Sequence, residues 1–240
     1  MGPKLLSMSI DFSVSEITDA NLTGADLREA LAHPLDAPWV FTRCDLSDAD
    51  LKDTDLTGAV FTDCRLDRAH LERAVLEGVV FTGGGAAGAV FAHSDCTDAG
   101  FERVDLANTR WQGALLTDTS FTGCRMTGAA LTSLRGIGYT IAQCNLMLAQ
   151  CKGIDLSGQN LEGLRMDEAD LSGADLSNTV WVESRLREVS WVGASFAGAD
   201  LRGADLGQPT LAQAGQLRGA TITPAQAGML LGGLGIMVAQ

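Results

Sequence analysis

The residues of this chain that could carry out chemistry are its cysteines, histidines and carboxylates. No two of the six cysteines form a CxxC pair, and the three histidines, His33, His70 and His93, lie at unrelated spacings. Metal sites need clustered thiol or imidazole ligands, so we expect no metal and no cofactor. No Ser/His/Asp or Cys/His grouping places a nucleophile beside its base. We therefore expect that the chain is not an enzyme.

Carboxylates dominate the charge of the chain. Asp and Glu number 30 against 17 Lys and Arg, which gives a net charge of -13. This balance argues against nucleic-acid binding, because a surface that binds DNA or RNA is basic. The chemistry left to the carboxylates is electrostatic recognition of a cationic partner, since acid–base catalysis needs a cleft that separates their pKa values. Where they lie depends on the elements that carry them.

Large apolar residues recur at every fifth position from Phe41 to Leu211. Of the 35 positions in this series, 31 hold Leu, Phe, Met, Trp or Ile. A period of five fits neither an amphipathic helix nor a half-buried strand. Small residues usually stand two positions before each large one, as at Ala49 and Ala59. Two inward positions in every five residues predict a coil that folds round a narrow interior.

A second period of twenty residues is laid over the first. Phe41, Phe61, Phe81, Phe101 and Phe121 stand twenty residues apart, and Val-Phe-Thr occurs at 40–42, 60–62 and 80–82. Twenty residues are four pentads, so each coil should have four sides and should pair with the next like parallel strands, ~4.8 Å away. This predicts an all-β solenoid.

All six cysteines fall on predicted inward positions. Cys44 and Cys64 lie one coil apart in the same column, so a disulfide between them is sterically conceivable. We favour reduced thiols that serve as small core residues.

The repeated A-D-L-x-x pattern, undiluted at 169–176 and 199–206, resembles the pentapeptide repeat family. The resemblance covers roughly residues 10 to 222 and implies a right-handed quadrilateral parallel β-helix with about 20 residues per coil. We expect the β-helix to occupy residues 1–222 and a capping or dimerisation segment to occupy 223–240.

The pattern is interrupted near the N-terminus and in the middle of the chain. Four pentads centred on Phe12 to Leu27 are one residue out of phase with those after Phe41. Two prolines between them predict a loop at 28–40, with the candidate residues His33, Pro34, Leu35, Asp36 and Trp39. Large residues at small positions predict an irregular region at 132–165, with Arg135 on a bulging corner. The run Gly83 to Gly85 more often marks tight packing than a phosphate site.

The last residues change character. Thr223-Pro224 predicts an N-cap and a first helical position, and Gly232-Gly233 predicts a stop, so we expect a short helix at Ala225–Leu231. No charge occurs from Thr223 to Gln240, and an exposed apolar segment usually marks an interface. A plain cap on the last coil is the alternative. The candidate residues of a homodimer interface are Met229, Leu230, Leu231, Leu234, Ile236, Met237 and Val238.

When the outward residues are assigned to the four sides of the predicted coils, most of the uncompensated negative charge falls on one side. The acids of this side are Asp55, Glu77, Asp95, Asp98, Asp118, Asp155 and Asp175, and its one base is Arg135. A solvated surface that aids solubility is the plain interpretation. The alternative is that regularly spaced carboxylates stand where the phosphates of duplex DNA would.

The resemblance extends to members of the family of the Qnr and MfpA type in length, acidity, interrupting loops and apolar C-terminal tail. It implies a DNA mimic that binds DNA gyrase or topoisomerase IV and protects it from a topoisomerase poison, as in antibiotic resistance or self-immunity. The alternative is a structural or adaptor β-helix that binds another protein without DNA mimicry. No apolar run is long enough to span a membrane and no signal peptide is recognisable, so we expect a cytoplasmic protein.

Overall fold

The computed structural model describes residues 10–32, 37–233, 235 and 236. They form two compact units. Unit 1 comprises the residues up to Ala130 together with Leu134–Thr140, and unit 2 comprises Leu131–Ser133 together with Ile141–Gln240. Each unit is a parallel β-solenoid in which paired residues stand twenty apart, as in Phe61↔Phe81 of unit 1 and Leu161↔Trp181 of unit 2. The predicted fold class is confirmed.

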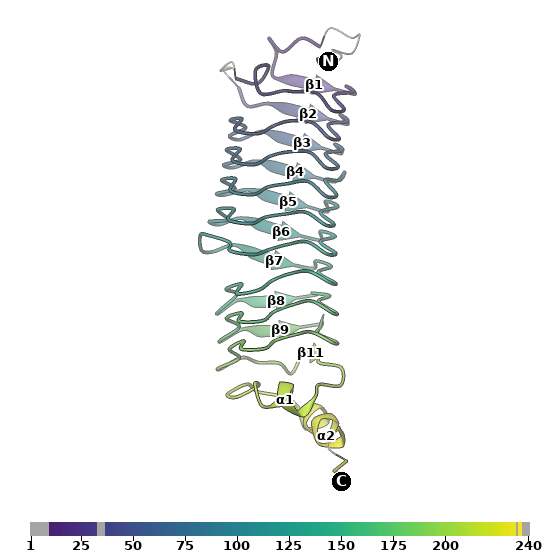
Figure 1. Ribbon diagram of the computed structural model, residues 1–240, viewed down its shortest axis with the longest axis vertical. Helices are drawn as coiled ribbons and strands as arrows, with labels where there is room; N and C mark the ends of the chain where they lie inside the picture. The colour runs from purple at the N-terminus through teal and green to yellow at the C-terminus, as the bar shows by residue number, and fades with distance from the viewer. Residues whose placement is uncertain (1–9, 33–36, 234, 237–240) are drawn as a thin grey trace. The chain divides into compact units, whose positions relative to one another are not determined.

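The coils from β1 to β9 each contribute one regular three-residue strand on the side that carries the Phe column, here called the Phe side. In unit 1 these strands are β1 (Glu16–Thr18), β2 (Val40–Thr42), β3 (Val60–Thr62), β4 (Val80–Thr82), β5 (Gly100–Glu102) and β6 (Ser120–Thr122), which pair in sequence order (Figure 1). Strand β7 (Thr140–Ala142) begins at the last residue of unit 1. Unit 2 contains β8 (Asn160–Glu162), β9 (Val180–Val182), β10 (Ser184–Arg185) and β11 (Ala204–Asp205). The other sides pair through single parallel bridges five residues apart, such as Asp45↔Arg65 and Asp50↔His70.

The corners between sides are built by residues in the left-handed region. Every fifth residue from Asp48 to Gly128 has a positive φ, and the non-glycine ones lie between 51° and 60°. On three sides of the coil a turn hydrogen bond closes the corner, as in the bond from the Ala49 amide to the Leu46 carbonyl at 3.1 Å. Four such corners in twenty residues bring the chain back above its starting point, so each coil is four-sided.

The large residues of each pentad fill the interior. Phe41, Phe61, Phe81, Phe101 and Phe121 are at most 2% exposed. Their rings stack in one column with centroids 4.5 to 5.0 Å apart. Offset and parallel aromatic contacts at this spacing add stability beyond area burial. The inward side chains therefore stack coil on coil in the same register as the backbone.

The Phe side replaces its turn hydrogen bonds with bonds to cysteine and serine. The Phe41 carbonyl accepts a bond from the Cys64 thiol at 3.3 Å, and the Cys44 amide donates to the same sulfur at 3.4 Å. In unit 2 the Ser184 hydroxyl donates to the Leu161 carbonyl at 3.0 Å and accepts from the Leu164 amide at 3.1 Å. This explains why Cys44, Cys64 and Cys124 occupy the equivalent position of their coils in unit 1. All six thiols are free.

The first coil is joined to the second by four extra residues. Ile17 pairs with Phe41, twenty-four positions further on, while the next coils are offset by twenty. Of the predicted loop residues, 33–36 lie outside the described part of the chain. Trp39 requires a correction, because it is 5% exposed and stacks on Phe41 with centroids 6.0 Å apart. It occupies the small inward position of its pentad and belongs to the core.

Two short helices follow the last coil of unit 2. The first, α1 (Leu211–Ala214), is capped by Thr210 and was not predicted. Leu211, counted in the sequence as the last large inward position, is 64% exposed at the start of this helix. The second, α2 (Pro224–Gly232), has the predicted cap at Thr223. The Gln226 side-chain amide donates to the carbonyls of Leu201 and Ala204 at 2.8 and 2.7 Å. These two carbonyls of the last coil thus accept hydrogen bonds from the helix in place of bonds from a following coil.

The sulfur bonds of the Phe side can be tested by substitution. Cys64→Ala removes the partner of the buried Phe41 carbonyl and of the Cys44 amide, so it should lower the free energy of unfolding by about 1 to 3 kcal/mol. Cys64→Ser should cost less, because Ser184 fills the equivalent position in unit 2. Urea unfolding followed by circular dichroism measures both. Equal losses in the two variants would contradict the bonding role of the side chain.

Candidate functional site

The predicted acidic residues fall on one side of the coils within each unit, here called the acidic side. In unit 1 this side contains the parallel bridges Asp55↔Val75, Val75↔Asp95, Asp95↔Leu115 and Leu115↔Arg135. In unit 2 it contains Asp155↔Asp175 and Asp175↔Ser195. Asp55 and Asp95 therefore stand two coils apart in a single column, with an aliphatic residue in the coil between them.

The acids of unit 1 occupy two kinds of position. Asp55 and Asp95 precede a large inward residue, and each Oδ1 accepts bonds from the amide and the hydroxyl of the threonine two residues on, at 3.0 and 2.7 Å. Asp98 and Asp118 stand at left-handed corners with φ of 57° and 54° and are exposed, and Glu77, which directly precedes the corner residue Gly78 one coil before Asp98, is also exposed. The first kind is held in one orientation, whereas the second kind projects into solvent.

The turn bonds also affect ionisation. Hydrogen bonds from the Thr57 hydroxyl and amide lower the pKa of Asp55, and those from Ser177 lower the pKa of Asp175. Both hydrogen bonds favour the carboxylate over the carboxylic acid. These side chains are therefore anionic throughout the neutral range.

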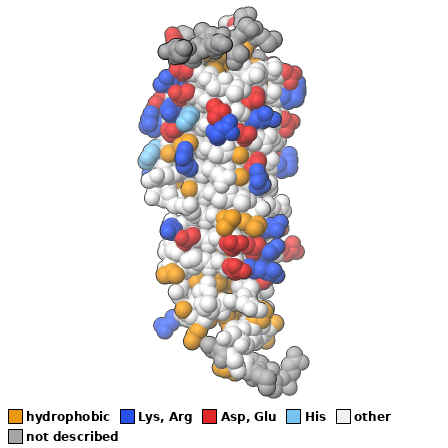
Figure 2. Space-filling model, turned by 45° about the vertical axis from the view of Figure 1, so that its right-hand side comes forward, with side chains coloured by type: hydrophobic (Ala, Val, Ile, Leu, Met, Phe, Trp, Pro, Cys, Tyr) orange, Lys and Arg blue, Asp and Glu red, His pale blue; other side chains and the backbone are white. Residues whose placement is uncertain are grey.

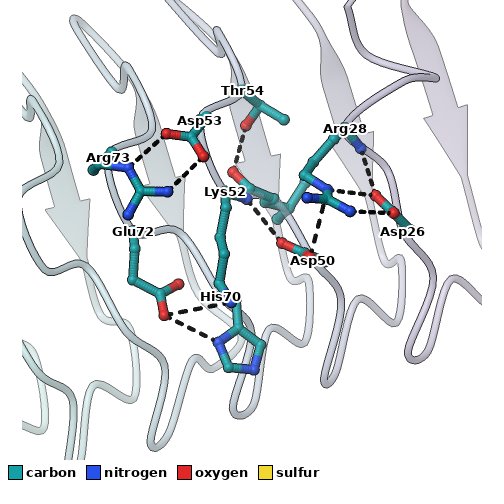
Figure 3. Close-up of polar contacts among 10 residues, drawn as sticks. Asp26, Arg28, Asp50, Lys52, Asp53, Thr54, His70, Glu72 and Arg73 are labelled. Carbon is teal, nitrogen blue, oxygen red and sulfur yellow. Dashed lines mark hydrogen bonds and ion pairs between the residues drawn. The ribbon is translucent and has the colours of Figure 1, made fainter.

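On the other sides, many of the acids are paired with bases, several of them from the adjacent coil. The Arg68 guanidinium binds both carboxylate oxygens of Asp48 at 2.7 and 2.6 Å, and Arg73 binds those of Asp53 at 2.6 Å each. Figure 3 shows Arg73 on Asp53, with Lys52 and His70 approaching Glu72 on the same side of the coils. Figure 2 shows such red and blue groups lying against one another on the face in view. Exposed pairs of this kind add little stability, but they cancel charge locally.

The acidic side of unit 1 lacks this compensation. Among the residues that the structure describes, Asp55, Glu77, Asp95, Asp98 and Asp118 take part in no ion pair. The guanidinium Nε of Arg135, the base of this side, donates to the Gly113 carbonyl at 2.9 Å. The side thus carries five carboxylates against one base.

Arg135 lies on an irregular corner that follows the acidic side. Ile137 is 78% exposed there, and Figure 1 shows the corner before β7 extending further than those of the preceding coils. Gly136 has a φ of 92°, and a Cβ at this position would lie 2.6 Å from the Thr117 amide nitrogen, so only glycine fits. The Asp118 amide donates to the Ile137 carbonyl at 2.9 Å, which ties this corner to the acidic side.

The predicted dimerisation residues are partly described. Met229 and Leu231 of α2 are 48% and 37% exposed, and Ile236 beyond it is 50% exposed. Leu230 is half-buried. The remaining three, Leu234, Met237 and Val238, lie outside the described residues.

Two of the cysteines, Cys96 and Cys151, are fully buried in the core. Burial raises the pKa of the Cys96 and Cys151 thiols to about 12, so neither forms a thiolate nucleophile near neutral pH. Within the described ranges, no three His, Cys, Asp or Glu residues are placed to hold a metal ion. No helix in that part of the chain is both long enough and apolar enough to cross a membrane.

Two features of the site were not recognised in the sequence. One is the turn bond of each aspartate that precedes a large residue, which the D-x-T spacing of Asp55 and Thr57 signals. The other is the pairing of acids and bases twenty residues apart, as in Asp48 and Arg68. Both signals become readable only after the twenty-residue coil has been accepted.

The repeats match the family model described as pentapeptide repeats in eight copies, over residues 41–83, 99–133, 144–180 and 182–208. Two solved structures of trypsin-treated QnrB1 variants, a plasmid-mediated fluoroquinolone resistance protein, have a similar fold. The first is 22% identical with a TM-score of 0.72, covering 83% of this chain and 100% of QnrB1. The second is 20% identical with a TM-score of 0.63, covering 94% and 99%. No curated protein sequence matches this chain.

The ion pairs of the coils predict how stability depends on pH. Hydrogen bonds from Arg28 and Arg202 lower the pKa of Asp26 and Asp200 to about 2. Because the folded pKa lies below the unfolded one, this contribution is present above pH ~4 and is lost as pH falls towards 2. The urea concentration at the midpoint of unfolding should therefore decrease as the pH is lowered from 4 to 2. The variant with Asp26→Asn and Asp200→Asn should lose less over this window, and an identical pH dependence in both proteins would contradict the assignment.

Proposed function

The chain belongs to the pentapeptide repeat family, and we propose from this premise that its acidic side binds DNA gyrase or topoisomerase IV in place of duplex DNA. The observation that carries the proposal is the group of five acids in unit 1 that form no ion pair with any residue that the structure describes. A topoisomerase holds DNA on a positively charged surface, and an anionic side of fixed shape complements such a surface.

The density of charge supports mimicry of one DNA strand. The five acids of unit 1 come from four consecutive coils, which span ~14 Å at ~4.8 Å per step. In coil order they are Asp55, then Glu77, then Asp95 with Asp98, then Asp118. Five charges over this length give roughly one per 3 to 4 Å, close to the ~3.4 Å per phosphate along one strand. A side with paired charges, such as that of Asp53 and Arg73, has no comparable field.

We further propose that the protein protects the topoisomerase from a poison, as an antibiotic-resistance or self-immunity factor. The fold that it shares with QnrB1, a fluoroquinolone resistance protein, supports this role. Occupying the DNA site alone would inhibit the enzyme, so protection needs an additional contact. The loop predicted within residues 28–40, without the core residue Trp39 and the strand residue Val40, and the corner at Arg135 are the proposed elements for that contact. The proposed role is binding in the cytoplasm and not catalysis.

Charge removal tests the binding proposal. The variant with Asp55, Asp95, Asp98 and Asp118 all changed to Asn keeps the turn acceptors and the left-handed corners, which Asn tolerates. It should bind gyrase at least about tenfold more weakly at low salt and melt at a similar temperature. Parent binding should itself weaken steeply as salt rises. The measurement is biolayer interferometry on immobilised gyrase.

The matched control removes four charges elsewhere. Glu162, Glu168, Glu183 and Glu188 are exposed, and changing them to Gln should leave affinity within about threefold. Equal losses in the two variants would show that net charge alone matters. In that case a structural or adaptor β-helix becomes the better description.

The corner at Arg135 separates protection from binding. Arg135→Ala removes the bond to the Gly113 carbonyl, and with it the one base that the described residues place on the acidic side of unit 1. It should reduce rescue of gyrase supercoiling from a fluoroquinolone more than it reduces affinity. Full rescue by this variant would place protection elsewhere.

We also propose a homodimer joined through the C-terminal segment. The exposed apolar residues of α2 support it, because a continuous apolar patch on a protein surface usually marks an interface. Met229→Asp with Leu231→Asp should convert a dimer to a monomer in light scattering. A parent protein that is monomeric at micromolar concentration would leave these helices as a cap on the last coil.

A further inference from the structure

Aspartates that precede a large inward residue bond to their own turn on several sides of the coils. In each, Oδ1 accepts the amide two residues further along, at 3.0 to 3.2 Å. The residues that share this bond outside the acidic side are Asp26, Asp45, Asp50, Asp105, Asp170, Asp200 and Asp205. The bond fixes the carboxylate and turns Oδ2 away from the corner.

In all seven, Oδ2 is bound by a cationic side chain of the same chain. Lys152 lies 3.2 Å from Oδ2 of Asp170, and Arg187 lies 2.6 Å from that of Asp205. Asp45 and Asp105 take their bases, Arg65 and Arg125, from the residue that stands twenty further along and directly opposite in the next coil. The remaining pairs are Asp26 with Arg28, Asp50 with Arg28, and Asp200 with Arg202. Turn bond and cation thus occur together.

Asp55 and Asp95 have the turn bond to Oδ1, but no described cation lies on their Oδ2. Their Oδ1 atoms accept the turn bonds from Thr57 and Thr97, while no described residue bonds to either Oδ2. The opposite positions in the next coil, which hold arginine beside Asp45 and Asp105, here hold Val75 and Leu115. Val75 is 36% exposed and Leu115 is half-buried.

We propose that the partner supplies the missing cations: arginine or lysine side chains of another protein bind Oδ2 of Asp55 and Asp95. This rests on the proposed function and specifies its contact. The two carboxylates are two coils apart, so the partner's cations should be about 10 Å apart. Val75 and Leu115 provide aliphatic surface for the stems of these side chains. Thr57 and Thr97 act as positioning residues, because their hydroxyls hold each carboxylate in the orientation that binds guanidinium on the other sides.

The test supplies the cations within the chain. The variant with Val75→Arg and Leu115→Arg reproduces the Asp45–Arg65 arrangement on the acidic side, so the introduced arginines should occupy Oδ2 of Asp55 and Asp95. Gyrase binding should weaken at least about tenfold, with no loss of thermal stability. The charge-matched control, Val80→Arg with Ser120→Arg, adds the same two charges at the equivalent outward position of the Phe side and should weaken binding less than about threefold.

The outcomes separate the two proposals. If both arginine variants weaken gyrase binding equally, or if neither weakens it, the inference about Asp55 and Asp95 is overturned. The proposal that the protein binds gyrase is unaffected by either result. A parent protein that does not bind gyrase overturns the proposed function and the inference together.

The positioning role has its own readout. Thr57→Val with Thr97→Val keeps side-chain shape and removes the hydroxyl bonds, so it should weaken binding severalfold and raise the pKa of Asp55 in a carboxyl-detected NMR titration. Thr57→Ser with Thr97→Ser should restore both. Unchanged affinity in the valine variant, with the pKa raised, overturns the positioning role.

Discussion

The left-handed corner at every fifth residue is the constraint on which this structure depends. A corner one residue earlier or later would exchange inward and outward positions for every residue that follows. Arg68, Arg73 and His93 adopt this conformation although they are not glycine, which costs roughly 1 to 2 kcal/mol each. The ladder of backbone hydrogen bonds between coils offsets that cost, because each corner aligns five residues with the coil beneath.

The corners also explain how charge is arranged without a folded pocket. Each outward position recurs twenty residues later at the same place on the next coil, so a residue type repeated along a column becomes a stripe. Columns that alternate acid and base, such as Asp48 and Arg68, become locally neutral. The column of Asp55, Val75, Asp95 and Leu115 alternates acid with aliphatic residues and keeps its charge. Charge in this architecture follows from column composition, and in the proposed function the aspartate that closes its own turn is also the one that faces the partner.

Much of this could be predicted from the sequence, and the failures have physical causes. The five-residue and twenty-residue periods predicted the inward residues and the length of one coil, because a large residue that is buried at every fifth position makes the sequence periodic. Trp39 was misassigned because two prolines near it suggested a loop, while its own place two residues before Phe41 is an inward one. Leu211 was misassigned for the opposite reason: it keeps the five-residue spacing, but the Thr210 cap starts a helix there. The ion pairs were missed because they join residues that become neighbours only through the coil.

The three identical Val-Phe-Thr strands have a consequence for how such a chain can change in length. Since β2, β3 and β4 present the same residues to the coils above and below, each is an equally good neighbour for the others. Duplication or loss of a whole twenty-residue coil in this region preserves the Val-Phe-Thr pairing at the new junction, whereas loss of one residue within a coil shifts the inward positions that follow it. The four extra residues between β1 and β2 leave the pairing of these two strands in register, because Ile17 still stands opposite Phe41. Insertions or deletions of twenty codons would therefore lengthen or shorten the outer surface of the solenoid by one coil at a time. The size of this step is set by the backbone.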